Sequence, residues 1–250
     1  MRKIVLSIVV FLTALALFVL RPWSDYSPLA MDSLFHPDKR VENMRNMHRI
    51  FPYRQIHAGN TRFNFADTNG SLEVTYTFDG EQRQLQDFLQ RVDGTGLLGI
   101  QGDRILHEQY RLGADEDSLF TSWSVAKSFV ATLIGMALYE GRIQSLDDAV
   151  TDYVPELTGS AWEGVSIRHV LQMSSGVEFD ETYANKRSDI NKFFWKLFVF
   201  GRRADDVLHD YEPGDEPGPL FHYVSMETQV LSQLLRKVYA TPLTTVMQER

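Results

Sequence analysis

A serine and a lysine three residues apart are the pair in this chain best suited to do chemistry. Ser124 and Lys127 lie in the stretch FTSWSVAKSFVATLIGMALYEG, and residues at positions i and i+3 share one face of a helix. Desolvation of the lysine amine is expected to lower its pKa, so that the amine can act as a base. The pair predicts a serine nucleophile beside its base. The alternative is that Lys127 extends to solvent and Ser124 only caps the helix.

The helix that must position this pair is predicted at residues 123 to 140. Ser122 is suited to cap its start and Gly141 to end it. The apolar residues from Val125 to Leu138 cover nearly every side of a helical turn, which predicts a helix buried all round. The apolar run is too short, and too often broken by polar residues, to cross a membrane.

Several sequence segments around Ser124 and Lys127 add to what these two residues indicate. They read SWSVAKSF, GMALYEGRIQSLDDAVTDYVPEL and SIRHVLQMSSGVEFDE, with an earlier segment RVENMRNMHRIFPYRQI. Together they resemble the serine hydrolases of the penicillin-recognising superfamily, in its class C beta-lactamase-like branch, and most of all the 6-aminohexanoate-oligomer (nylon dimer) hydrolases. The resemblance implies that Ser124 is acylated and that Lys127 assists proton removal. It also implies a Tyr-x-Asn or Tyr-x-Ser box that supplies a second proton-handling group.

Two tyrosines compete for this second box. Tyr183-Ala184-Asn185 matches the pattern literally but lies in a polar stretch that predicts an exposed loop. Tyr223-Val224-Ser225 follows a segment rich in proline and glycine and precedes a helical pattern, as in the related family. We therefore expect Tyr223 to be the catalytic general acid or base. Tyr183 and Ser225 are expected to contact substrate.

Other classes of site find little support in the sequence. The histidines show no zinc-ligand spacing and the chain has no cysteine, so neither a metal nor another cofactor is expected. The formal net charge of −8 argues against nucleic acid as a partner. No Lys-Thr-Gly triplet, the usual third box of the superfamily, occurs in the chain.

The N-terminus predicts export from the cytoplasm. Arg2 and Lys3 precede an uncharged, largely apolar stretch from Ile4 to Leu20. This pattern fits either a signal peptide or a short membrane span, and only Ala14-Leu15-Ala16 offers a weak cleavage site. We favour an uncleaved anchor over residues 4–20. In a Gram-negative cell it would hold the protein in the inner membrane, on the periplasmic side.

The predicted fold is α/β (α+β) and beta-lactamase/transpeptidase-like: an antiparallel sheet flanked by helices, with an inserted, mostly helical region. The domains expected are an anchor or signal peptide at 1–22, an extended lead-in at 23–70 and the hydrolase domain at 71–250. A half-buried strand is predicted at 72–78, and a hairpin of two strands at 96–101 and 104–111. Further helices are predicted at 82–92, 166–174 and 188–200, the last two each with a serine suited to cap its start. The resemblance implies C-terminal strands bearing the third box. They are expected to be missing here, which would leave this part a poor catalyst.

The function expected is that of a serine hydrolase acting through an acyl-enzyme on a small-molecule acyl substrate, such as an amide or ester. The alternative is a non-catalytic, penicillin-binding-like scaffold or binding module. The missing third box favours the alternative. The joint presence of Ser124, Lys127 and Tyr223 favours the enzyme.

Overall fold

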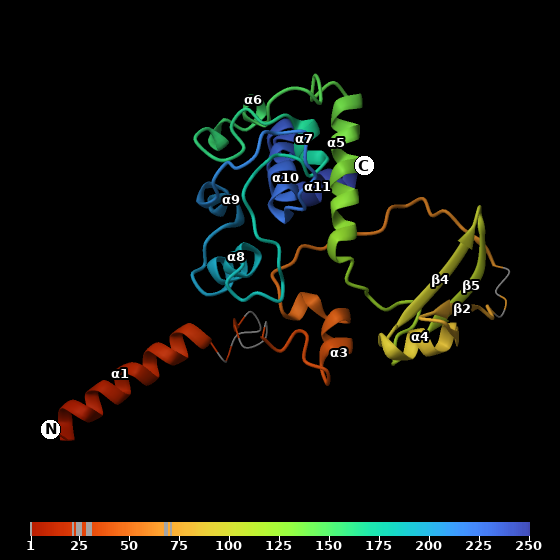
Figure 1. Cartoon of the computed structure of the whole chain (residues 1–250), viewed down its shortest axis with the longest axis horizontal. Helices are drawn as coiled ribbons and strands as arrows, with labels where there is room; N and C mark the ends of the chain where they lie inside the picture. Colours follow the sequence, from red (N-terminus) through yellow and green to blue (C-terminus); the bar gives the residue numbers. More distant parts are fainter. Residues whose placement is uncertain (1, 22, 24–26, 29–31, 68–69, 71) are drawn as a thin grey trace. The chain divides into compact units, whose positions relative to one another are not determined.

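A computed structural model of the chain describes residues 2–21, 23, 27–28, 32–67, 70 and 72–250. These form two compact units (Figure 1). The helical unit comprises Met1–Pro28, Tyr53–His57 and Ser122–Arg250, and the sheet unit comprises Leu29–Pro52 and Ala58–Thr121. The predicted boundary after residue 22 falls on a position outside the described residues.

The sheet unit is built on the predicted hairpin. β4 (Gly96–Gln101) and β5 (Arg104–Tyr110) pair antiparallel around Gly102, whose φ of +60° suits glycine. A short strand, β1 (Ala66–Asp67), pairs with β5 in parallel. The two long strands therefore lie where the sequence pattern predicts them.

Three other predictions for the sheet unit are wrong in part. Residues predicted as the start of a helix form β3 (Glu81–Gln84), because the turn at Asp79 and Gly80 folds them back onto β2 (Thr75–Phe78). The helix α4 begins only at Leu85 and ends at Arg91. β2 is mostly exposed rather than half-buried. The lead-in is not simply extended, since it contains α3 (Arg40–Arg45) and the 3-10 turn η1 (Met47–Arg49).

The helical unit contains the main hydrophobic core. Its two longest core helices, α5 (Ala126–Tyr139) and α10 (Ser225–Tyr239), contact each other, and Trp162 is fully buried in the same core. The shorter elements are α6 (Val150–Tyr153), η3 (Pro155–Leu157), α7 (Ile167–Leu171), α8 (Asp189–Phe198), α9 (Ala204–Val207), η4 (Leu208–Asp210) and α11 (Leu243–Glu249). The hydroxyls of Ser166 and Ser188 cap α7 and α8, as the sequence predicts.

Helix α5 is not buried all round, so that prediction is wrong. Val130, Leu133, Ile134 and Ala137 face the core, but Phe129 is 54% exposed. The reason is that packing partners such as α10 cover one face of the helix and leave the opposite apolar face open. Sequence periodicity reports where apolar residues lie on a helix, not whether a partner covers each of them.

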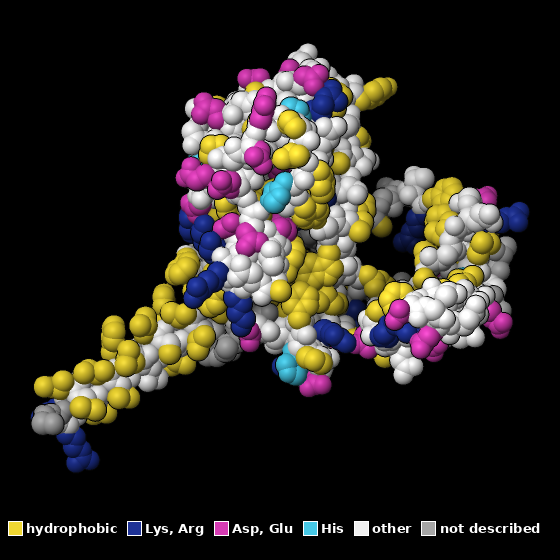
Figure 2. All heavy atoms as spheres, viewed as in Figure 1, with side chains coloured by type: hydrophobic (Ala, Val, Ile, Leu, Met, Phe, Trp, Pro, Cys, Tyr) yellow, Lys and Arg dark blue, Asp and Glu magenta, His cyan; other side chains and the backbone are white. Residues whose placement is uncertain are grey.

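The apolar N-terminal segment forms a single helix, α1 (Arg2–Leu20), with no buried residue. Figure 2 shows hydrophobic side chains along its visible length. By length and composition it could cross a membrane, and a signal sequence would pass the same test. The side chain of Arg21, which follows the helix, donates a hydrogen bond to the carbonyl oxygen of Phe198.

Candidate active site

Ser124 lies in a one-turn 3-10 helix, η2 (Trp123–Val125), directly before α5. The predicted cap is wrong, because the side chain of Ser122 makes no capping hydrogen bond to this turn. Instead, the chain turns sharply at Trp123, whose φ of +44° lies in the left-handed region that non-glycine residues rarely adopt. The bend places the exposed hydroxyl of Ser124 ahead of the helix.

Lys127 lies on the first turn of α5 and reaches back to the serine. Its Nζ is 3.2 Å from Ser124 Oγ, which is hydrogen-bonding distance. The lysine is half-buried. The expected i, i+3 contact between the two side chains is therefore present.

Tyr223 lies 99 residues after Ser124 in the sequence, in the segment just before α10. Its hydroxyl donates a hydrogen bond of 2.8 Å to Ser124 Oγ. The Nζ of Lys127 also lies 5.3 Å from the centre of the tyrosine ring, within the range of a cation–π contact. Ser124 Oγ thus has two proton-carrying groups within hydrogen-bond reach.

This arrangement is chemically specific. A serine hydroxyl is a weak nucleophile unless a neighbouring group removes its proton, and here two groups are close enough to do so. Because Ser124 is exposed, a carbonyl compound can approach its oxygen. Ser124 is therefore placed to attack an acyl group, and Lys127 and Tyr223 are both placed to exchange protons with its oxygen.

Tyr183 belongs to a polar loop and is 61% exposed, as the sequence predicts for the literal Tyr-Ala-Asn match. Its hydroxyl donates to Glu181 Oε1 at 2.7 Å rather than to Ser124. Partial burial and this bond to Glu181 raise the pKa of Tyr183 to about 12. Its phenol therefore stays protonated at neutral pH.

Glu181 is a residue that the sequence reasoning missed. Besides Tyr183, it accepts hydrogen bonds from the backbone N–H of Ser225 at 3.0 Å and from the Ser225 hydroxyl at 2.6 Å. One carboxylate thus ties the Tyr183 loop to the first turn of α10, two residues beyond Tyr223. A carboxylate two residues before a loop tyrosine was the available signal. The Ser225 hydroxyl, expected to contact substrate, is engaged by Glu181.

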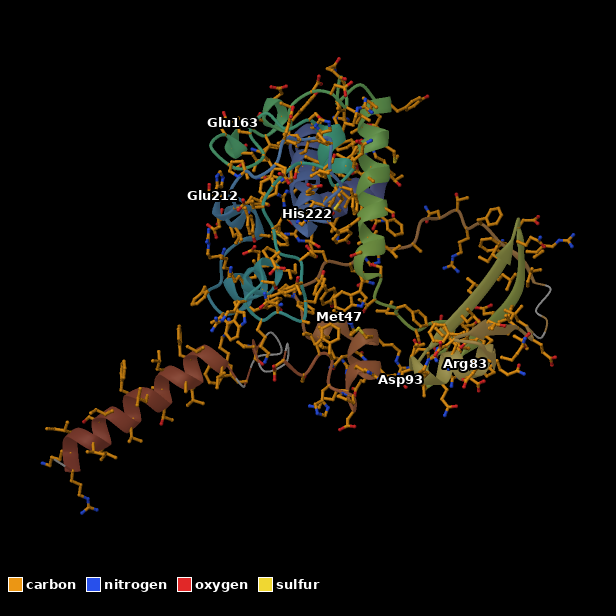
Figure 3. The ribbon with its side chains drawn as sticks, viewed as in Figure 1. Met47, Arg83, Asp93, Glu163, Glu212 and His222 are labelled. Atoms are coloured by element: carbon orange, nitrogen blue, oxygen red, sulfur yellow. The ribbon has the colours of Figure 1, made fainter. Side chains whose placement is uncertain are left out.

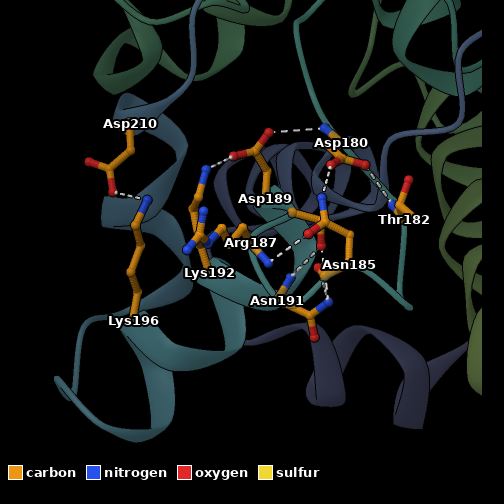
Figure 4. Close-up of polar contacts among 10 residues, drawn as sticks. Asp180, Thr182, Asn185, Arg187, Asp189, Asn191, Lys192, Lys196 and Asp210 are labelled. Atoms are coloured by element: carbon orange, nitrogen blue, oxygen red, sulfur yellow. Dashed lines mark hydrogen bonds and ion pairs between the residues drawn. The ribbon is translucent and has the colours of Figure 1, made fainter.

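The loop that carries Tyr183 is held by a polar network (Figure 4). Asn185 donates to Asp180, and Asn191 of α8 donates to the backbone carbonyls of Tyr183 and Asn185. The N–H of Asp180 bonds to Asp189, also on α8. The loop is exposed but anchored at several points, so the position of Tyr183 is defined by the fold.

Among the described residues, no group of three or more His, Cys, Asp and Glu side chains is placed to hold a metal ion. The site described above consists of serine, lysine, tyrosine and glutamate side chains.

Comparison with known proteins identifies the family. The sequence model of the beta-lactamase family matches residues 82–250, more than half of the chain. The chain belongs to the beta-lactamase family. This family match covers Ser124, Lys127, Tyr183 and Tyr223.

Curated relatives within the family point in the same direction. A 6-aminohexanoate-dimer hydrolase of Paenarthrobacter ureafaciens is 32% identical over 174 residues, covering 66% of this chain and 44% of the relative. A beta-lactamase of Yersinia enterocolitica is 41% identical over 61 residues, covering 24% of this chain and 16% of the relative. This family member therefore spans less than half the length of these relatives.

Solved structures confirm the predicted fold class. A protein from Bacillus anthracis, described as a candidate 6-aminohexanoate-dimer hydrolase, superimposes with a TM-score of 0.74 at 18% identity. The match covers 92% of this chain and 61% of that chain. A likeness at this identity concerns the fold, which is that of the beta-lactamase family.

Proposed function

We propose that this chain carries the nucleophilic site of a serine hydrolase that works by acyl transfer. The observation that carries the proposal is the placement of Ser124 Oγ 3.2 Å from Lys127 Nζ and 2.8 Å from the Tyr223 hydroxyl. Membership of the beta-lactamase family supports it. A non-catalytic scaffold has no need to bring these three groups onto one oxygen.

In the proposed mechanism, Ser124 attacks a carbonyl carbon and Lys127 acts as the base that takes the hydroxyl proton. Tyr223 passes a proton to the leaving group, which departs as the acyl-enzyme forms. A water molecule then gives a proton to Tyr223 and attacks the acyl-enzyme, and the acid leaves as Lys127 returns its proton to Ser124. The backbone N–H of Ser124 is expected to supply one donor to the oxyanion.

The substrate class that we propose is a small linear amide or an ester. The curated relative that matches over 174 residues is named for hydrolysis of the 6-aminohexanoate dimer, and joining two amino acids makes an amide. Tyr183 is proposed to contact such a substrate from its loop, because its hydroxyl is held in place by Glu181 while most of its ring is exposed. We propose that Ser225 also contacts substrate, as an acceptor, because its hydroxyl donates to Glu181 and keeps its lone pairs.

We further propose that α1 anchors the protein in the cytoplasmic membrane and leaves the site outside the cytoplasm. The support is a largely apolar helix of 19 residues with no buried residue, which begins with two basic residues, Arg2 and Lys3. In a Gram-negative cell this location is the periplasmic side of the inner membrane.

The direct test is mass spectrometry after exposure of the protein to a fluorophosphonate, which reacts with activated serines. We expect one adduct, on the peptide that contains Ser124. A protein that remains unmodified while folded would instead be a scaffold without the chemistry.

The two tyrosines are expected to differ in what they contribute. Replacing Tyr223 with phenylalanine removes the hydroxyl that touches Ser124, and kcat on an amide should fall by roughly 10² to 10⁴. Tyr183→Phe should mainly raise KM. Steady-state kinetics on both variants give the comparison. A severe loss in the Tyr183 variant with a mild one in the Tyr223 variant would make Tyr-Ala-Asn the catalytic box.

A further inference from the structure

Helix α10 carries a fully buried carboxyl group that the proposed mechanism does not use. Glu227 lies in the first turn of the helix, four residues after Tyr223, and its side chain is 0% exposed. Burial raises its pKa to about 8, and no charged side chain of the described residues contributes to this shift. The group is therefore largely a neutral acid at pH 7. A neutral acid costs much less to bury than a carboxylate.

The partner of Glu227 is Ser175, itself 3% exposed. The N–H of Ser175 donates to Glu227 Oε1 at 3.4 Å, while Oε2 has no hydrogen-bond partner among the described residues. Ser175 belongs to the segment Met173–Gly176, which lies outside any helix or strand. The buried acid thus connects this irregular segment to the start of α10.

The same segment holds the backbone on both sides of Tyr223. The N–H of His222, labelled in Figure 3, donates to the Met173 carbonyl at 2.8 Å, and the N–H of Val224 contacts Met173 Sδ at 3.4 Å. The N–H of Gly218 donates to the Ser174 carbonyl at 2.8 Å. The residues before and after the tyrosine therefore depend on where this segment lies.

We propose that Glu227 is a positioning residue for Tyr223 and that it fastens the segment 173–176 to the first turn of α10. The inference rests on the proposed function in assigning a catalytic role to the tyrosine hydroxyl. The connection runs from Glu227 through Ser175 and Met173 to the backbone of Tyr223. A displacement of about 1 Å at a reacting group can lower the rate by about 10²-fold, so a small shift of this segment is sufficient.

Two substitutions separate positioning from stability. Glu227→Gln keeps the shape, the acceptor and a neutral donor. Glu227→Leu keeps much of the volume but removes the link to Ser175 and leaves the buried N–H of Ser175 without this acceptor, so a loss of stability accompanies it and needs a control. Leu234→Ala is the matched control, because Leu234 is fully buried on the same helix, seven residues after Glu227, and its truncation destabilises the core without removing the Glu227–Ser175 hydrogen bond.

Hydrogen–deuterium exchange at the amides of residues 222 and 224 reports the position of the segment directly and needs no enzymatic activity. We expect exchange as slow as in the unmodified protein in Glu227→Gln, and at least 10-fold faster exchange in Glu227→Leu at unchanged protection of α5. In Leu234→Ala, any increase should spread over the core rather than centre on these amides.

Kinetics on a chromogenic ester supply the second measurement. We expect kcat to fall by about 10- to 100-fold in Glu227→Leu with KM little changed, and to stay within a few-fold in Glu227→Gln. Unchanged exchange at residues 222 and 224 in Glu227→Leu would overturn the proposal, and so would a Gln variant that behaves like the Leu variant. If Ser124 took no label at all, the proposed function would fail while the exchange data still decided the role of Glu227.

Discussion

Replacing Ser124 with alanine is expected to abolish covalent labelling by a fluorophosphonate and all hydrolysis that passes through an acyl-enzyme. The reason is that the oxygen removed is the one that both Lys127 and Tyr223 contact. Loss of a nucleophile in an enzyme of this kind costs several orders of magnitude in kcat, on the order of 10⁶ in the best-studied serine hydrolases. Intact-mass measurement of labelled protein gives the result without any knowledge of the substrate.

Two neighbouring serines provide matched controls. Ser122 and Ser128 are exposed like Ser124 and flank it in the sequence, yet neither side chain has a hydrogen bond to Lys127 or Tyr223 in the described structure. Ser122→Ala and Ser128→Ala should therefore label at the normal rate. If one of these two variants lost the label and Ser124→Ala kept it, the nucleophile would be assigned to the wrong residue.

The second large effect is expected at Lys127. Lys127→Ala should lower the rate of acylation by roughly 10² to 10⁴, the range for loss of a positioned general base. Lys127→Arg should fail as well, because a guanidinium remains protonated and cannot accept the serine proton. The measurement is the second-order rate constant for labelling of Ser124.

A lysine elsewhere in the helical unit controls for the loss of charge. Lys237, in the last turn of α10, forms an ion pair with Glu156 and has no hydrogen bond to Ser124 or Tyr223 in the described structure, so Lys237→Ala should label normally. Near-normal labelling of Lys127→Arg would contradict the base assignment and show that the site requires only a positive charge.

Local sequence patterns, together with the resemblance that implies a tyrosine box, predict that Ser124, Lys127 and Tyr223 meet at the candidate site. The i, i+3 spacing brings Lys127 to Ser124 as expected. The choice of Tyr223 over Tyr183 came from the loop-then-helix context, and the structure brings the Tyr223 hydroxyl to Ser124. Such contacts depend on helix geometry and on the order of elements along the chain, and both can be predicted from the sequence.

Interactions between distant segments were not predictable in the same way. Glu181 bonds to Ser225 across 44 positions and Glu227 to Ser175 across 52, and neither pair carries a spacing signal. The open face of α5 was missed because its apolar residues look the same in sequence whether or not another element covers them. The β2–β3 hairpin was missed because the polar residues of β3 fit a helix equally well until pairing with β2 decides the matter.

The left-handed backbone at Trp123 limits how far this protein can be stabilised without harm. A non-glycine residue held at φ +44° costs of order 1–3 kcal/mol, which the surrounding fold must offset. Glycine at this position would remove the penalty, but it would also let the turn before Ser124 sample other geometries. A substitution at position 123 that raises thermal stability is therefore expected to lower turnover, as in other proteins where a strained site trades stability against activity.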